Sequence, residues 1–254
     1  VVEKGVYAGE RIAGEINIGC GVCNFCREGL SRHCPKRKTL GIYKKDGIFA
    51  EYVTLPDEII FRIPDEISNE EAVFIEPVAA AIEILEQVKI PPDSKTAIVG
   101  DGKLGHIVAQ ILKLTGCYVK VYGKNEKKLK LLENLQISTD IFSGKIDRSY
   151  DYVVECSGST GGFGTALSLI KPRGTIILKS TIVEPLSVDT SRIVVDEITI
   201  VCSRCGRFQP AIRLMKDKLI KVDYMISAIF PLEEYKKAFA YAKKRDTLKV
   251  LFKI

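Results

Sequence analysis

The chain has 254 residues, of which 46% are hydrophobic, a formal net charge of +6 and eight cysteines. This length suits one large or two ordinary domains, and the apolar content is enough for a packed core. No window approaches eighteen consecutive apolar residues and no signal-peptide pattern opens the chain, so we expect a soluble, cytoplasmic protein without membrane contact. The basic residues are scattered among 32 acidic ones, a pattern typical of solvated surface rather than of nucleic-acid binding.

Residues 1–70 carry short apolar runs, at 12–18 and 49–55, that are broken by Gly, Pro and Asp. Runs of this kind predict strands and loops. Ser68, with Glu71 three residues later, predicts a capping box ahead of a helix at 72–75. A second helical stretch, 79–87, runs toward a turn at two prolines.

Four of the eight cysteines lie close together in CGVCNFCREGLSRHC, with the spacing C-x2-C-x2-C-x7-C. They are Cys20, Cys23, Cys26 and Cys34. Clustered thiols in a reducing compartment favour metal over disulfides, and such a loop can close four thiolates around a tetrahedral structural zinc. An iron–sulfur cluster is the alternative, disfavoured by the long last gap and the lack of a second cysteine set. A redox pair is weaker, since its C-x-x-C should open a helix after a strand.

The remaining cysteines and both histidines have less specific interpretations. We expect the cysteines to be buried small hydrophobic residues, with a C-x-x-C redox pair as the alternative for the last two. We expect both histidines to be exposed or helix-capping rather than metal ligands. These residues are Cys117, Cys156, Cys202, Cys205, His33 and His106.

From residue 96 onward the pattern changes to alternating strands and helices. The predicted strands are 96–99, 118–122, 152–154, 175–178 and 198–201, and the predicted helices are 104–114 and 126–135. This alternation indicates a parallel sheet covered on both faces. The tail, with a predicted helix at 232–242 and a strand at 250–252, indicates a return to the first domain.

The first predicted strand of the sheet runs directly into GDGKLG, a G-x-G-x-x-G motif at a strand-to-helix turn. In this context the glycines permit a tight turn, close approach to a pyrophosphate and close helix–strand packing. The helix N-terminus then presents its N–H groups to the anion. The expected cofactor-binding residues of this loop are Gly100, Asp101, Gly102, Lys103, Leu104 and Gly105.

The end of the second strand bears on the choice of dinucleotide. An NAD-binding chain normally has Asp or Glu there, about 20 residues after the loop, to bind the ribose 2′-OH. Here Gly123 occupies that position and Lys124 follows it. The absence of a carboxylate and the nearby cation favour NADP over NAD, with surface charge as the alternative reading of the lysine.

Several segments, taken together, resemble the zinc-containing medium-chain dehydrogenase/reductase (alcohol dehydrogenase) superfamily, in its polyol, threonine and sorbitol dehydrogenase-like branch. They are the cysteine lobe, GIFAEYVTLP, FIEPVAAAIEIL, the glycine loop, DYVVECSGS, LIKPRGTIILKS and FPLEEYKKAF. The resemblance implies an α/β fold with a Rossmann doubly wound parallel sheet, residues 73–226. It would be inserted in a β-rich GroES-like domain, residues 1–72 and 227–254, incomplete at its N-terminus, with the structural-zinc lobe at 20–34.

The resemblance also implies a zinc-dependent, NAD(P)-linked dehydrogenase that passes a hydride between an alcohol or polyol carbon and a nicotinamide. Glu76, in EPV, matches the family's catalytic glutamate, a ligand or near neighbour of the catalytic zinc. An ordinary acid at the start of a helix is the alternative. Ser157, after the predicted strand 152–154, is expected to contact the cofactor, and the assembly is expected to be a homodimer or homotetramer.

The family's other catalytic-zinc ligands, a cysteine and a histidine, precede the segment VVEKGV with which this sequence begins. We therefore expect a family member without that stretch, which binds a dinucleotide and one zinc but lacks full turnover. A non-catalytic dinucleotide-binding or zinc-scaffold protein of the same fold is the alternative. A zinc-ribbon nucleic-acid binder is a third, disfavoured because Phe25 is the only aromatic residue within the cluster.

Overall fold

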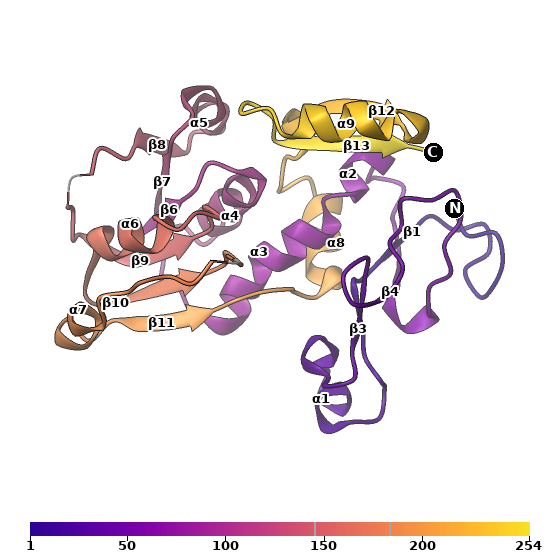
Figure 1. The fold of residues 1–254 in the computed structure, drawn as a ribbon, viewed down its shortest axis with the longest axis horizontal. Helices are drawn as coiled ribbons and strands as arrows, with labels where there is room; N and C mark the ends of the chain where they lie inside the picture. The colour runs from indigo at the N-terminus through magenta and orange to yellow at the C-terminus, as the bar shows by residue number, and fades with distance from the viewer. Residues whose placement is uncertain (145, 183) are drawn as a thin grey trace.

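The computed structural model describes residues 1–144, 146–182 and 184–254. A large parallel sheet with helices on both faces forms one side of the molecule (Figure 1). Smaller β-rich units, which include both ends of the chain, form the other side, and helices α3 (Ile75–Gln87) and α8 (Phe208–Lys216) lie between the two (Figure 1).

The large sheet has the strand order β11-β10-β9-β6-β7-β8, and every neighbouring pair is parallel. Strands β7 and β8 lie on one side of β6, and β9, β10 and β11 lie on the other. The strand order therefore reverses between β6 and β9. Ligands bind at such switch points, beyond the carboxyl ends of the strands. The strands are β6 (Lys95–Val99), β7 (Tyr118–Gly123), β8 (Ser138–Ile141), β9 (Tyr150–Glu155), β10 (Ile170–Leu178) and β11 (Thr199–Cys202).

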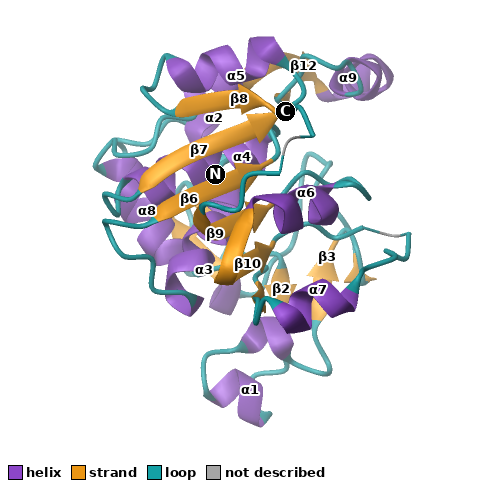
Figure 2. Ribbon diagram, turned by 90° about the vertical axis from the view of Figure 1, so that its left-hand side faces the viewer, coloured by secondary structure: helices purple, strands orange, loops and turns teal. Residues whose placement is uncertain are grey.

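The two faces of the sheet have separate hydrophobic cores, and strand β6 contributes to both. Ile98 packs into a core with α3 and α4 (Lys103–Lys113), whereas Ala97 and Val99 pack into a core with α6 (Gly162–Leu169). This alternation is the two-residue period of a strand that is covered on both faces. The remaining helices of this region are α5 (Glu126–Glu133) and α7 (Thr190–Val195) (Figure 2).

The β-rich side consists of three small sheets. β1 (Ile12–Gly14) pairs antiparallel with β5 (Ile60–Arg62), and β12 (Ile226–Pro231) pairs parallel with β13 (Lys249–Lys253) beside α9 (Tyr235–Ala242). A three-stranded sheet is formed by β2 (Asn17–Ile18), β3 (Lys38–Leu40) and β4 (Lys44–Lys45). The cysteine lobe lies between β2 and β3 and contains α1 (Asn24–Arg27) and η1 (Ser31–His33). Short 3-10 turns complete this part, at η2 (Asp57–Ile59), η3 (Asp223–Met225) and η4 (Leu232–Glu234).

The predicted capping box is confirmed at the start of α2 (Asn69–Ala72). The Ser68 hydroxyl accepts from the Glu71 backbone N–H at 3.1 Å, and the Glu71 carboxylate accepts from the Ser68 N–H at 2.8 Å. Helix α3 begins four residues before the predicted 79, at Ile75. Pro77 lies in its first turn, where a helix tolerates proline because the missing N–H has no partner there.

The predicted sheet strands and helices are confirmed to within a few residues, but the strand predicted at 49–55 is wrong. That segment forms an exposed loop in which the exposed fractions of Phe49 and Tyr52 are 65% and 72%. Its apolar residues mimic a strand pattern, yet no strand among the described residues pairs with them. Strands β3, β4, β5, β8 and β12 were not predicted; β8, Ser-Thr-Asp-Ile at a sheet edge, is largely exposed and lacks an apolar signal.

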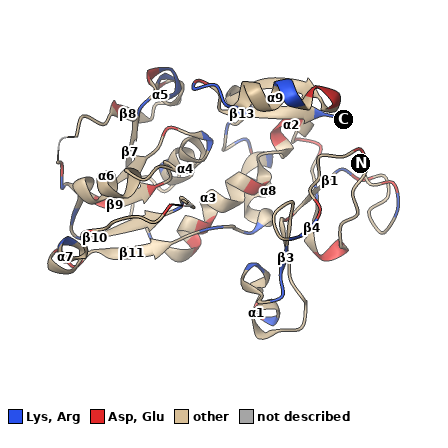
Figure 3. Cartoon of the chain, in the orientation of Figure 1, with Lys and Arg blue, Asp and Glu red and all other residues tan. Residues whose placement is uncertain are grey.

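No helix among the described residues has the length and apolar character needed to cross a bilayer. Lys and Arg positions are interspersed with Asp and Glu along α5 and the η4–α9 segment (Figure 3). This distribution agrees with the scattered charge expected from the sequence.

Candidate cofactor and metal site

The glycine loop connects β6 to α4 at the carboxyl edge of the sheet, and each glycine has its own steric reason. Gly100 has φ +129°, and a Cβ there would lie 2.9 Å from backbone atoms of Cys156 and Ser157. A Cβ on Gly105 would collide with the Gly100 carbonyl oxygen. Gly102, the N-cap of α4, has open space around it. The loop therefore fits a pyrophosphate, which needs a tight turn, close helix packing and free access to the helix N-terminus.

The other residues expected at the cofactor come together at the same edge. Lys103 and Leu104 form the first turn of α4, and Lys103 is exposed. Ser157 follows β9 beside Gly100, but its hydroxyl points inward and lies 2.6 Å from a carboxylate oxygen of Glu155. Lys124 is exposed after β7, 23 residues from Asp101, and donates its backbone N–H to the Asp101 carboxylate.

Glu155 was missed by the sequence reasoning. Its carboxylate accepts the Ser157 hydroxyl and, at 2.9 Å, the Ser157 backbone N–H. A Cβ on Gly162, at the start of α6, would collide with the same carboxylate. Glu155 therefore fixes the turn between β9 and α6. An acidic residue at the end of an apolar strand was the feature of the sequence that could have indicated this role.

The structure brings the four lobe thiols together. The Sγ atoms of Cys20, Cys23, Cys26 and Cys34 all lie within 4.8 Å of one another. Zinc–sulfur bonds of about 2.3 Å with tetrahedral angles need sulfurs about 3.8 Å apart, so a small contraction would close this cluster on zinc. Backbone N–H groups of Val22 and Cys23 lower the pKa of the Cys20 thiol, while burial and the neighbouring thiols raise the pKa of Cys23, so without a metal the cluster favours a thiolate at Cys20 and a thiol at Cys23. The four thiols fit a closed structural zinc site.

Side-chain contacts hold the lobe and the adjacent strand β2 against the rest of the molecule. The Arg32 guanidinium lies 2.7 Å from the Glu83 carboxylate of α3. Arg204, in the segment after β11, donates to the Arg32 carbonyl oxygen at 2.7 Å, and the Asn17 amide donates to the Cys205 sulfur at 3.4 Å. The lobe is thereby positioned against α3 and the 203–207 segment.

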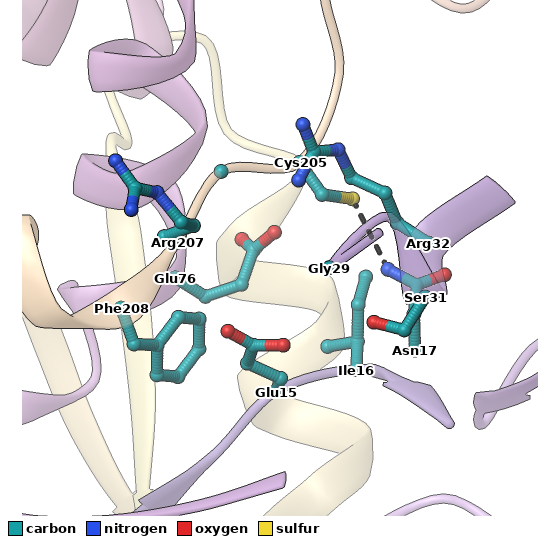
Figure 4. A pocket seen from close by; sticks show the side chains of 11 residues that line it. Glu15, Ile16, Asn17, Gly29, Ser31, Arg32, Glu76, Cys205, Arg207 and Phe208 are labelled. Atoms are coloured by element: carbon teal, nitrogen blue, oxygen red, sulfur yellow. Dashed lines mark hydrogen bonds between the residues drawn. The ribbon is translucent and has the colours of Figure 1, made fainter. Parts of the chain in front are cut away.

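Glu76 lies in the first turn of α3 and lines a pocket between the lobe and the 203–207 segment. In this pocket the Glu76 carboxylate lies between the Arg207 and Cys205 side chains, and the Glu15 carboxylate lies beside the Phe208 ring (Figure 4). Burial raises the pKa of Glu76, while the charges of Lys249 and Lys179 oppose that shift. Burial also raises the pKa of Glu15, against a hydrogen bond from the Phe208 backbone. The arrangement offers a shielded carboxylate to a polar ligand or metal.

Lys179, directly after β10, is a second residue that the sequence reasoning missed. Only 9% of it is exposed, and burial lowers the pKa of its ammonium group to about 8. Its Nζ donates to the carbonyl oxygens of Ala80 and Arg204, both at 2.7 Å, and to the Ser203 hydroxyl at 3.1 Å. Three acceptors match the three protons of an ammonium group, so Lys179 joins the sheet to the helix that carries Glu76.

The remaining cysteines and histidines only partly follow expectation. Cys117 is buried and His33 is exposed, as expected. The prediction is wrong for Cys202, which is exposed at the edge strand β11, and Cys205 is half-buried in the pocket rather than in a core. It is also wrong for His106, which is fully buried on the inner face of α4, with Nδ1 3.0 Å from the Tyr224 hydroxyl.

Comparisons with known proteins agree with this architecture. Residues 2–65 match the alcohol dehydrogenase GroES-like domain, and residues 104–217 match the zinc-binding dehydrogenase family. The chain is 29% identical to D-arabitol-phosphate dehydrogenase of Enterococcus avium, with 99% of this chain and 78% of that protein covered. It is 25% identical to sorbitol dehydrogenase of Halalkalibacterium halodurans, with 97% and 77% covered.

A solved structure from Sinorhizobium meliloti 1021, described as a zinc-binding dehydrogenase bound to NADP, has a TM-score of 0.88 at 26% identity. The alignment covers 98% of this chain and 78% of that one. The GroES-like match covers the β-rich N-terminal part of the chain, and the zinc-binding dehydrogenase match covers most of the parallel sheet that follows it. The chain belongs to the zinc-containing medium-chain dehydrogenase/reductase superfamily, in its polyol dehydrogenase branch.

Proposed function

We propose that this chain is a zinc-dependent, NAD(P)-linked dehydrogenase that acts on an alcohol or polyol. The observation that carries the proposal is the glycine loop at the switch point of the parallel sheet, whose three glycines meet three distinct steric demands of a pyrophosphate site. Relatives named as sorbitol and D-arabitol-phosphate dehydrogenases support the substrate class.

The cofactor would be held along the carboxyl edge of the sheet. Gly100 to Gly105 and the N-terminus of α4 would bind the pyrophosphate, and Ser157 would line the crevice next to them. The same edge leads to Lys179, whose backbone N–H donates to the Glu155 carbonyl oxygen at 2.8 Å. Lys179 in turn contacts the helix of Glu76, so the crevice and the pocket are connected through one buried side chain.

Two metal roles are proposed for the chain's own residues. The four lobe thiols would hold a structural zinc, and Glu76 would face a catalytic zinc as a ligand or near neighbour. A zinc bound there would polarise the alcohol oxygen while a nicotinamide takes up the hydride. Among the described residues the four thiols are the only set of three or more metal-ligating side chains close enough to share one ion. Glu76 is therefore not part of such a set among the described residues.

We also propose the division into a GroES-like domain, residues 1–72 and 227–254, and a Rossmann domain, residues 73–226. The confinement of the parallel sheet to strands between Lys95 and Cys202 supports this division. A homodimer or homotetramer, as the resemblance implies, is proposed and is testable by light scattering. A cytoplasmic location is proposed because none of the eight cysteines is in a disulfide.

The decisive experiment combines metal analysis, calorimetry and an activity assay on the purified chain. We expect one zinc per four-thiol cluster and saturable binding of a nicotinamide dinucleotide. Failure to bind either NAD or NADP would contradict the proposal. Because Glu76 belongs to no set of three metal-ligating side chains among the described residues, we expect little or no dinucleotide reduction with D-sorbitol, D-arabitol or a polyol phosphate, and rapid reduction would contradict this expectation.

A further inference from the structure

The carboxylate of Asp101 reaches from the glycine loop to the end of the neighbouring strand. Strands β6 and β7 lie side by side and parallel, so their carboxyl ends meet at one edge of the sheet (Figure 2). Asp101 follows β6, and its Oδ2 accepts the backbone N–H of Lys124 at 2.6 Å and that of Asn125 at 2.7 Å. Both donors directly follow β7, which ends at Gly123.

The absence of a side chain at position 123 is explained by this contact. A Cβ on Gly123 would lie 2.5 Å from Oδ2, 2.6 Å from Cβ and 2.9 Å from Cγ of Asp101. The φ angle of Gly123 is not in the left-handed region, so its backbone does not itself require glycine. The Asp101 side chain thus fills the space that a side chain at the end of β7 would occupy.

This is the place where NAD-binding folds put an acidic residue. There the carboxylate accepts a hydroxyl of the adenosine ribose, and it disfavours the 2′-phosphate of NADP. In this chain the acid comes from the first loop instead of from the second strand. Among the described residues nothing donates a hydrogen bond to the Oδ1 atom of Asp101, so an acceptor remains for a hydroxyl group.

We propose that Asp101 is the specificity-determining residue that makes this chain prefer NAD to NADP. The proposal rests on the proposed function and departs from the preference for NADP inferred from Gly123 and Lys124. The carboxylate places a negative charge beside the ribose and takes up two backbone N–H groups that would otherwise be available to a 2′-phosphate. Both effects act against NADP.

The nearby cations do not neutralise the effect of the Asp101 carboxylate on the ribose site. The side chain of Lys124 is exposed, whereas the Asp101 carboxylate is partly buried and held by two hydrogen bonds. Arg245 donates to the Lys124 carbonyl oxygen at 3.0 Å, and Lys127 lies 2.6 Å from the Asp246 carboxylate. An exposed lysine is screened by solvent, so the fixed carboxylate decides the preference.

The test is calorimetric titration of the full chain with NAD and with NADP, compared across variants. The wild type is expected to bind NAD about tenfold or more tighter than NADP, a ratio of dissociation constants that calorimetry resolves easily. Asp101→Asn keeps the side-chain shape but removes its charge, and should reduce that ratio by about tenfold, mainly through tighter NADP binding. Lys124→Ala should leave the ratio within about threefold of the wild type.

Asp151→Asn is the matched control. Asp151 also accepts a backbone N–H, from Lys95 at 2.7 Å, but at the opposite ends of β6 and β9. The Asp151→Asn variant should leave the ratio of NAD to NADP affinity unchanged. Circular dichroism with thermal midpoints would confirm that each variant is folded.

Three outcomes would overturn the proposal: a wild type that prefers NADP, an Asp101→Asn variant with an unchanged ratio, or a Lys124→Ala variant in which the preference shifts strongly. In each of them a dinucleotide still binds and the proposed function stands. If the wild type bound neither dinucleotide, the proposed function would fail as well.

Discussion

The guanidinium of Arg32 lies 2.7 Å from the Glu83 carboxylate, and this ion pair joins the cysteine lobe to helix α3. Only 3% of the Glu83 side chain and 18% of the Arg32 side chain are exposed. The Gln87 amide donates to the same carboxylate oxygen at 2.9 Å. A charge that is buried in this way depends on its partner, because removal of one member leaves the other without compensation.

Arg32→Ala is therefore expected to lower the free energy of unfolding by about 3 kcal/mol, since the Glu83 carboxylate stays buried without its cation. Urea unfolding followed by circular dichroism measures the change. Arg207→Ala is the matched control, because Arg207 pairs with Glu86 of the same helix at 2.7 Å but with side-chain exposed fractions of 58% and 39%. That exposed pair should contribute less than about 1 kcal/mol. Equal losses in the two variants would refute the argument.

The thiol cluster makes a separate prediction about metal content. Cys26→Ser replaces one thiolate with a hydroxyl, a poor zinc ligand, and should reduce the bound zinc from about one per chain to near zero. The thermal midpoint should fall too, because the binding energy of a structural zinc contributes to folding. Elemental analysis and a thermal scan give the two readouts.

Cys202→Ser controls for thiol loss as such, since Cys202 is exposed and lies outside the cluster. It should retain the full zinc content and the wild-type midpoint. Iron and sulfide with visible absorbance in the wild type would instead support the iron–sulfur alternative.

How far the sequence predicts this fold depends on whether the signal is local. Central strands such as β6 and β7 are covered on both faces, so they appear as unbroken apolar runs next to a glycine turn. The edge strand β8 is short, polar and largely exposed, and it has no such signal. The segment 49–55 has a local signal without a partner strand among the described residues, and it forms a loop.

The site residues that were missed depend on contacts between distant segments. Asp101 meets Lys124 and Asn125 across 23 and 24 residues, so a search for an acid at position 123 alone could not find it. Lys179 contacts Ala80 from 99 residues away. Polar residues of this kind look like surface residues in a sequence, and only their contacts in the folded chain reveal their partners.

The glycine loop allows cofactor binding to be separated from folding. Gly102 has open space around it, so Gly102→Ala should fold normally while its methyl group keeps the cofactor's phosphates from approaching the backbone. We expect dinucleotide affinity to fall by about tenfold or more with little change in the thermal midpoint. Gly164→Ala, at an equally open position inside α6, should leave affinity unchanged and stabilise the fold by about 0.5–1 kcal/mol. Undiminished affinity in Gly102→Ala would exclude this loop as the phosphate site.

The last prediction concerns acid stability and His106. Burial lowers the pKa of His106 from 6.5 to about 4, opposed by the charge of Asp101. Between pH 6.5 and 4 the unfolded chain thus takes up a proton at this residue that the folded chain does not. The stability from the neutral histidine is complete above pH 6.5 and is lost as the pH falls toward 4.

Between pH 7 and pH 5 the wild type should lose about 2 kcal/mol more unfolding free energy than His106→Leu, which has no proton to take up at this position. Urea unfolding at the two pH values gives the difference. Burial raises the pKa of Glu15 and of Glu76, an effect of opposite sign, but it is shared by wild type and variant and cancels in the comparison. His33→Leu, at the exposed histidine, should change the pH dependence less than His106→Leu does, in the same direction, because burial and the Arg32 charge also lower the pKa of His33. The same pH dependence in wild type and His106→Leu would show that folding does not shift the pKa of His106.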